Sequence, residues 1–134
     1  LTSTRVERIE QVDGKKYVWA GGQKIVVDEI LVAAGRQPNV ESLNLEAAGV
    51  EVGNRGIEVN AKLQTTNPRI YACGDVIGGY QFTHVAGYEA SVVLKNALFF
   101  PLTKANYRVI PWATFTDPEL GRVGLTEQQA KERY

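Results

Sequence analysis

The apolar residues of the first 35 positions recur in short alternating segments divided by turn residues, which is the pattern of antiparallel strands. Asp13-Gly14 is a strong hairpin signal, and Gly21-Gly22 turns the chain a second time. Strands are therefore expected before Asp13, over Lys15 to Ala20 and over Lys24 to Val27. The continuous apolar run Ile30 to Ala34 predicts a further, buried strand. Together these segments predict a β-meander.

The pattern between positions 40 and 65 predicts a short helical turn and a second hairpin. Gly49 suits the C-terminal end of a helical turn. Val50 to Val52 and Ile57 to Val59 alternate on either side of a turn over Asn54-Arg55-Gly56.

A strand, a loop and a helix follow in close succession. Arg69 to Cys73 predicts a short apolar strand, and the glycine-rich residues 76–81 predict a loop. A helix is expected from Thr83, as its N-cap, to about Phe100, where Pro101 stops it. The apolar residues at helical spacing are Val85, Tyr88, Val92 and Phe99, with Glu89, Lys95 and Asn96 placed elsewhere around the helix.

The turn at the end of that strand carries the candidate chemistry. In open α/β sheets, ligands bind outside the carboxyl ends of the strands. Gly74 allows a ligand close to the backbone, and Asp75 offers two acceptor oxygens to sugar-type hydroxyls. The helix start adds N–H groups and a partial positive charge. The alternative is an ordinary strand-loop-helix turn in which Asp75 is only solvated.

The C-terminal 27 positions, after a linker over residues 102–107, show a different pattern. Arg108 to Thr116 predicts a strand, and Pro111 near its start favours a sheet edge. Arg122 to Leu125 predicts another strand. Thr126 with Gln129 three residues later has the form of a capping box, so a helix is expected to begin there.

Composition narrows the class of protein. With 134 residues, 44% hydrophobic and 22% charged, the chain suits one globular domain. The formal net charge is zero and no basic patch stands out, so no nucleic-acid partner is expected. No apolar run approaches the roughly 18 residues of a membrane span. We expect a cytoplasmic protein without membrane contact and, since methionine is absent, an internal fragment of a longer chain.

One block of residues resembles a known motif. Thr66, four further residues and Tyr71-Ala72-Cys73-Gly74-Asp75 resemble the second FAD-binding motif of the pyridine nucleotide-disulfide oxidoreductases, which include dihydrolipoamide dehydrogenase, glutathione reductase and mercuric reductase. The resemblance implies that Asp75, with Gly74 beside it, binds a ribityl hydroxyl of FAD. It also implies that backbone amides at the next helix start face the flavin. That helix start is Gln81-Phe82-Thr83-His84, which is closer to the mercuric-reductase branch.

Two further blocks resemble the same family in the same order. Ala34 to Asn39 is similar to the segment in which the chain leaves the NAD(P) domain for the FAD domain. This implies that Gly35 lies beside the nicotinamide cofactor and Val6 near its adenine end. A plain turn glycine and an ordinary strand residue are the alternatives. Pro111 to Ala130 resembles the opening of the family's dimerisation domain.

The resemblance implies an α/β fold, α+β within this chain, in three parts. Residues 1–35 are the β-meander of an NAD(P)-binding domain, 36–104 a segment of a Rossmann-like FAD-binding domain, and 105–134 the start of an α+β dimerisation domain. The implied activity passes electrons from NAD(P)H through FAD to a disulfide- or dithiol-linked acceptor, in a homodimer.

Several parts of that chemistry are missing from the sequence. It has no G-x-G-x-x-G fingerprint, no C-x-x-x-x-C pair and no C-terminal His…Glu pair. Cys73 is best explained as a small buried hydrophobe, and His84 as a neighbour of the flavin. We therefore expect no catalytic residue, no metal site and a colourless, inactive chain that oligomerises. The alternatives are a non-catalytic self-associating module and a flavin-free remnant with a different ligand.

Overall fold

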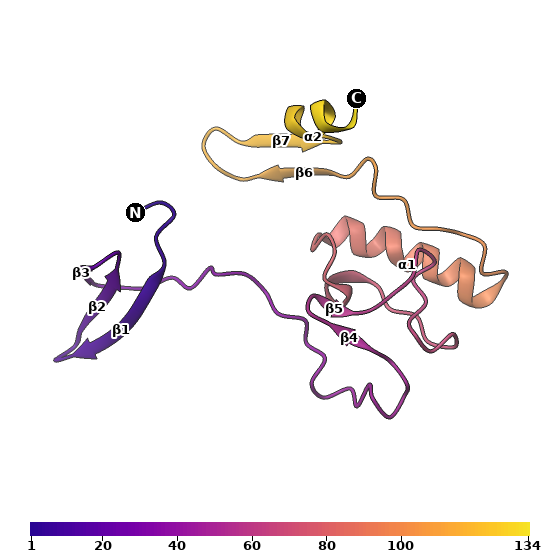
Figure 1. Ribbon diagram of the computed structural model, residues 1–134, viewed down its shortest axis with the longest axis horizontal. Coiled ribbons are helices and arrows are strands. Elements are labelled where there is room, and N and C mark those ends of the chain that lie inside the picture. The colour runs from indigo at the N-terminus through magenta and orange to yellow at the C-terminus, as the bar shows by residue number, and fades with distance from the viewer. The chain divides into compact units, whose positions relative to one another are not determined.

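The computed structural model describes residues 1–134, which divide into two units, Leu1–Arg36 and Gln37–Tyr134 (Figure 1). No helix in either unit combines the length and the apolar character that crossing a bilayer requires.

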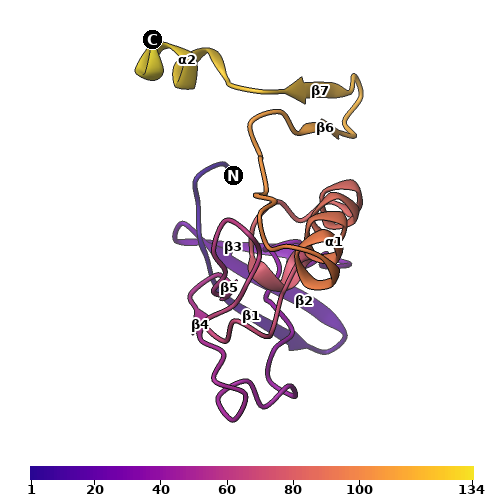
Figure 2. The same cartoon turned by 90° about the vertical axis from the view of Figure 1, so that its right-hand side faces the viewer.

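The first unit is a three-stranded antiparallel meander, as predicted. Strands β1 (Val6–Val12), β2 (Lys15–Ala20) and β3 (Gln23–Val27) follow one another in the sheet (Figure 2). The hairpin between β1 and β2 pairs Val12 with Lys15, and its two loop residues both have positive φ. This is the backbone that an Asp-Gly hairpin loop favours, because its twist matches that of the strands.

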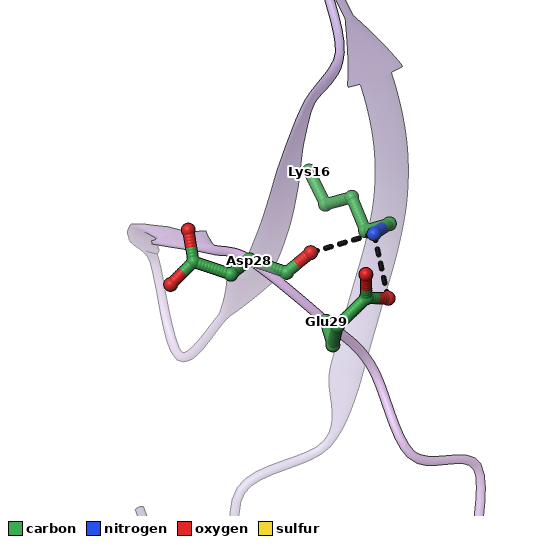
Figure 3. A network of polar contacts seen from close by, with 3 residues as sticks. All are labelled: Lys16, Asp28 and Glu29. Carbon is green, nitrogen blue, oxygen red and sulfur yellow. Dashed lines mark hydrogen bonds and ion pairs between the residues drawn. The ribbon is translucent and has the colours of Figure 1, made fainter.

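A lysine holds the chain that leaves the sheet. Lys16 Nζ donates to the carbonyl oxygen of Asp28 at 2.6 Å and pairs with Glu29 Oε2 at 2.7 Å (Figure 3).

On one face of the sheet, two cationic side chains lie over aromatic rings. Arg8 lies over the ring of Trp19 and Lys24 over that of Tyr17, both 4.0 Å from the ring centroid.

The strand predicted over Ile30 to Ala34 does not form. These residues have no regular secondary structure, and the side chains of Leu31 and Val32 are 91% and 80% exposed. A strand exists only when a neighbouring strand takes up its backbone hydrogen bonds. The apolar run indicates a tendency to be buried, but it pairs with neither edge strand of the sheet, β1 or β3.

The second unit contains two hairpins and two α-helices. The elements are β4 (Val52–Gly53), β5 (Gly56–Ile57), the 3₁₀ helix η1 (Gly74–Ile77), α1 (Thr83–Leu98), β6 (Pro111–Thr114), β7 (Leu120–Val123) and α2 (Glu127–Arg133). β4 pairs with β5 and β6 with β7, both antiparallel. The buried residues Val50, Ile57 and Ala72 form the core cluster, against which Leu45 and Val76 pack.

In place of the helical turn predicted before β4, the chain forms a series of turns. These turns end with the hydrogen bonds that are typical of a helix C-terminus. Gly49, with φ +68°, donates to the carbonyl of Glu46, and Val50 donates to that of Leu45. These two bonds are the Schellman arrangement that glycine favours.

The predicted strand Arg69 to Cys73 is reduced to a single bridge between Gln64 and Tyr71. Thr65 donates to the carbonyl of Ile70, and Ala72 to that of Leu63, so one edge of the segment is satisfied. The residue pattern was right about an extended backbone, but a ladder needs more consecutive partners than this unit supplies.

The buried face of α1 differs from the predicted one. Its buried residues are Val85, Glu89, Val92 and Asn96, whereas Phe99 lies beyond the helix end and is 74% exposed. Periodicity places apolar residues correctly at two of these positions. It misses Glu89 and Asn96, because a polar side chain is buried only when specific partners satisfy it.

The N-cap of α1 is Phe82 rather than Thr83. Phe82 has an extended backbone and makes no side-chain capping bond, while Thr83 is already helical. The N-cap residue therefore provides no side-chain acceptor for the first N–H groups of the helix, which a threonine at that position could provide.

The predicted linker 102–107 packs closely on α1. Asn96 donates to the carbonyls of Lys62 and Thr103 and accepts from the Thr103 N–H, and Ala105 donates to the carbonyl of Ala61. We call residues 102–110 the strap. After it, β6 and β7 form a hairpin that overlaps the predicted strands 108–116 and 122–125, and Thr126 caps α2 through a complete capping box with Gln129.

The loop between β4 and β5 lies so close to the end of η1 that only glycine fits at Gly78. Its φ is +65°, and a Cβ there would lie 1.8 Å from the carbonyl oxygen of Arg55. We expect Gly78→Ala to lower the free energy of unfolding by about 1–3 kcal/mol, or more if the loops separate. Urea denaturation followed by circular dichroism measures this.

Gly79→Ala is the matched control, because a Cβ at Gly79 meets nothing within 4 Å. Equal stability of the two variants would show that the close approach of the loops does not contribute to stability.

Candidate functional site

The turn that carries Asp75 is built on a glycine. Cys73 is extended, and Gly74 has φ +78°, a left-handed conformation that a side chain disfavours. η1 begins at Gly74 itself, and the Gly78 N–H donates to the backbone carbonyl of Asp75 at 3.1 Å. Asp75 is exposed in the first turn of η1, so the predicted ligand-binding carboxylate lies at the surface.

A second carboxylate supports this turn from inside. Glu89 is 1% exposed, and its Oε2 accepts a hydrogen bond of 2.6 Å from the Gly74 N–H. Its Oε1 accepts one of 2.8 Å from the hydroxyl of Tyr107 on the strap. A Cβ on Gly74 would lie 3.4 Å from that of Ala86, so the turn also packs directly on α1.

The predicted helix-start residues lie at the N-terminal end of α1, one position further into the helix than predicted. Gln81 and Phe82 are partly buried, whereas Thr83 and His84 are exposed. The first N–H groups of an α-helix have no acceptor within the helix, and Phe82 provides no side-chain cap. This end of α1 therefore presents backbone donors and a partial positive charge.

Aromatic side chains gather around the helix start. Phe82 stacks on His84, with ring centroids 5.5 Å apart and planes at 10°, and on Trp112 of β6 at 5.6 Å. Tyr80 contacts Phe82, Trp112 and Tyr107 at 6.5, 5.8 and 6.0 Å. The sequence analysis did not identify four residues of this region, because the spacing of residues along the chain does not reveal their contacts. These residues are Tyr80, Tyr107, Trp112 and Glu89.

An apolar cavity of about 610 Å³ adjoins the start of α1. It is lined by His84, Val85 and Tyr88 together with Asn106 and residues 108–111. Asp75 does not line it. His84 thus faces an apolar space formed with the end of the strap, and no carboxylate among the lining residues is positioned to make it a general base.

Cys73 has the properties of a structural thiol. Burial, and secondarily the negative charge of Glu89, raise the pKa of the Cys73 thiol above its ordinary value. Burial is also the main cause that raises the pKa of Tyr107, followed by its hydrogen bond to Glu89, so that hydroxyl stays a donor. A protonated thiol is a poor nucleophile, and the interpretation of Cys73 as a structural residue stays a prediction.

Val6 and Gly35 belong to the other unit. Val6 begins β1 with its side chain 49% exposed, and Gly35 has φ +112° with no atom within 4 Å of the position that a Cβ would occupy. Both residues are accessible, and their assignment to a nicotinamide cofactor stays a prediction.

Comparison with known proteins decides the family. The family model described as pyridine nucleotide-disulphide oxidoreductase matches residues 1–90, and that of the family's dimerisation domain matches residues 110–134. The chain belongs to the pyridine nucleotide-disulphide oxidoreductase family. The predicted family, the mixed α/β fold and the family's cofactors, FAD and NAD(P)H, are thereby confirmed.

Individual relatives agree with this assignment. The chain is 48% identical to a mercuric reductase of Staphylococcus aureus, over 99% of this chain and 25% of that protein. It is 41% identical to a dihydrolipoyl dehydrogenase of Bacillus subtilis, over 99% of this chain and 29% of that protein. The chain thus spans about a quarter of the length of the curated relatives it matches.

Solved structures show the same fold. The HOCl-induced flavoprotein disulfide reductase RclA from Escherichia coli, in a Cu(II) complex, matches with a TM-score of 0.83 and 37% identity, over 95% of this chain and 30% of that one. LpdA from Mycobacterium tuberculosis matches with a TM-score of 0.87 at 23% identity, over 97% of this chain and 29% of that one.

The raised pKa of Cys73 gives a testable result. At pH 8 the folded thiol holds less thiolate than an ordinary cysteine, so we expect iodoacetamide to modify it more slowly than in the same chain unfolded in urea. Mass spectrometry of timed samples measures both rates. Equal rates in the folded and unfolded chain would contradict the buried-thiol assignment.

Proposed function

We propose that this chain forms one wall of an FAD site in an oxidoreductase that passes electrons from NAD(P)H through FAD to a disulfide- or dithiol-linked acceptor, in the manner of a mercuric reductase. The observation that carries the proposal is the exposed Asp75 on a glycine turn, followed by the start of α1, whose N-cap residue makes no side-chain capping bond. The family match gives this arrangement its ligand.

The residues fit the cofactor chemically. Asp75 has acceptor oxygens for a ribityl hydroxyl, and Gly74 lacks a side chain that would obstruct the approach. The N–H groups of residues 83–85 are suited to donate to a flavin carbonyl and to stabilise negative charge near it. FAD, when bound, supplies the two-electron chemistry, while these residues bind and orient it.

The remaining assignments extend the same proposal. His84 and Gln81 lie at the helix start as neighbours of the flavin. Gly35, with no atom near its missing side chain, leaves room for the nicotinamide, and Val6 lies toward the adenine end. The division of the structure after Arg36 supports an NAD(P)-domain segment over 1–35, followed by an FAD-domain segment over 36–104 and a dimerisation segment over 105–134.

The wider setting is also a proposal. The match to a dimerisation domain supports a homodimer. We further propose a cytoplasmic protein that uses a small-molecule or disulfide substrate and binds neither nucleic acid nor membrane, which the zero net charge supports.

The second candidate is a self-associating module without flavin. Large apolar side chains at the C-terminal end of α1 and just after it favour it, since Leu98, Phe99, Phe100 and Leu102 are 67–77% exposed. Absorbance near 450 nm, the usual mark of oxidised flavin, separates the two candidates. We expect the 134-residue chain alone to be colourless, so flavin retention is best tested in a chimera.

A chimera tests the role of Asp75. In the chimera, this chain takes the place of the matching quarter of the Staphylococcus aureus mercuric reductase. The remaining three quarters keep the sequence of the reductase. We expect Asp75→Ala to weaken FAD binding about 10- to 100-fold, because a hydrogen bond to a charged group contributes about 1.5–3 kcal/mol. Flavin absorbance after gel filtration and titration of the apoprotein measure this.

Asp28→Ala is the control, since Asp28 is an exposed carboxylate in the first unit, outside the proposed flavin site. Flavin occupancy in the Asp75→Ala chimera equal to that of the control would refute the assignment.

The oligomeric state is a separate prediction. The exposed apolar residues after α1 and the match to a dimerisation domain lead us to expect an oligomer at micromolar concentration. Light scattering coupled to gel filtration measures the mass, and a single monomer peak of 14.8 kDa would contradict the expectation.

A further inference from the structure

The buried carboxylate of Glu89 is a group that the proposed function does not use. It is 1% exposed on the inner face of α1, and such a charge is costly to bury unless its oxygens are hydrogen-bonded. Both oxygens are bonded, and each to a different segment of the chain. Glu89 therefore joins three elements: the first residue of η1, the helix α1 and the strap.

The first bond acts on the orientation of Asp75. The donor is the N–H of Gly74, at 2.6 Å, so the bond fixes the peptide that enters the turn. Gly74 has φ +78°, and glycine rotates about its N–Cα bond more freely than any other residue. Because this bond fixes the peptide before Gly74, it also fixes the direction in which the chain continues toward Asp75.

The second bond keeps the carboxylate in place. The Tyr107 hydroxyl donates to Oε1 at 2.8 Å, and the Tyr107 ring packs on those of Tyr80 and Tyr88, at centroid distances of 6.0 and 6.4 Å. Tyr107 lies three residues before the segment that matches the dimerisation domain. The position of Glu89 thus depends on the strap being docked against α1.

Asn96 shows what a purely structural polar residue does on the same helix face. It is 3% exposed and binds the carbonyls of Lys62 and Thr103, so it also ties the strap to α1. None of these bonds reaches the turn at Gly74. Asn96 therefore provides a control for the loss of a buried polar contact between the same two elements.

We propose that Glu89 is a positioning residue for FAD binding, which fixes the Gly74 peptide so that Asp75 is presented to the ribityl chain, and that Tyr107 holds Glu89 in this role. This rests on the proposed flavin site. Glu89 does not touch the cofactor and acts through Asp75.

The first experiment needs no cofactor. In the isotopically labelled 134-residue chain, NMR follows the Gly74 amide proton and its hydrogen exchange. A short bond to a carboxylate should place that proton downfield and slow its exchange. We expect Glu89→Gln to move the resonance upfield and to speed exchange at least about tenfold relative to the core amides.

Tyr107→Phe is the second variant, because it removes one hydroxyl from the partner and leaves the Glu89 side chain intact. We expect a smaller change in the same direction. Asn96→Ala leaves both hydrogen bonds of Glu89 in place, so it should change the exchange of the strap and move the Gly74 resonance less than Tyr107→Phe does. A Gly74 signal unaltered by both Glu89→Gln and Tyr107→Phe would overturn the inference.

The second experiment is a double-mutant cycle in the chimera with the mercuric reductase. We expect Glu89→Gln to weaken FAD binding about tenfold, and Asn96→Ala to leave it within about twofold. If Glu89 acts through Asp75, the double variant Asp75→Ala/Glu89→Gln should bind FAD no more weakly than Asp75→Ala alone. Additive losses would overturn the positioning role.

The two proposals fail in different ways. If Asp75→Ala leaves FAD binding unchanged, the proposed function is wrong. If Asp75→Ala weakens binding while Glu89→Gln does not, the flavin assignment stands and the role of Glu89 is wrong.

Discussion

The carboxylate of Glu89, buried between α1, the Gly74 turn and the strap, is the contact on which the second unit depends. Its two hydrogen bonds join segments that are 15 and 18 residues away in the chain. Charge-assisted bonds of this kind contribute about 1.5–3 kcal/mol each, and an unpaired carboxylate in the same place would cost more than either bond contributes. The fold therefore forms with both donors in place.

The two carboxylates differ in their surroundings. Asp75 lies at the surface, where the proposed ligand would reach it, while Glu89 lies inside and accepts hydrogen bonds from Gly74 and Tyr107. The glycine between Cys73 and Asp75 makes this possible, because its left-handed backbone turns the chain sharply within one residue. A second close contact, between Gly78 and the loop at Arg55, holds the other end of η1.

The protein family supplies the chemistry that this arrangement serves. A match over residues 1–90 and another over 110–134 place both the turn and the C-terminal hairpin within one family of flavoproteins. The strap connects the two matched regions and carries Tyr107, so a support of the proposed flavin site lies close in the chain to the dimerisation segment. Partial burial raises the pKa of the Cys73 thiol, which disfavours the reactive thiolate form.

The elements that form as predicted are those whose structure depends on residues close together in the chain. The Asp13-Gly14 hairpin, strand β2, the long helix after Phe82 and the capping box of Thr126 form as predicted, because each is specified by turn chemistry or periodicity within a few residues. The position of Asp75 before a helix start was also visible in the sequence. Motif spacing was sufficient to indicate the family.

Only the tertiary structure decided where partners from distant segments meet. The apolar runs at Ile30 and Arg69 predicted strands, yet pairing depends on an edge that no local pattern records. Likewise, the sequence alone suggests that Glu89 is a surface residue. Its burial becomes understandable only with the two donors that the fold brings to its carboxylate, the Gly74 N–H and the Tyr107 hydroxyl. Periodicity indicates which residues of one segment tend to be buried. Whether a charged side chain is buried depends on the hydrogen-bond partners that the surrounding segments provide.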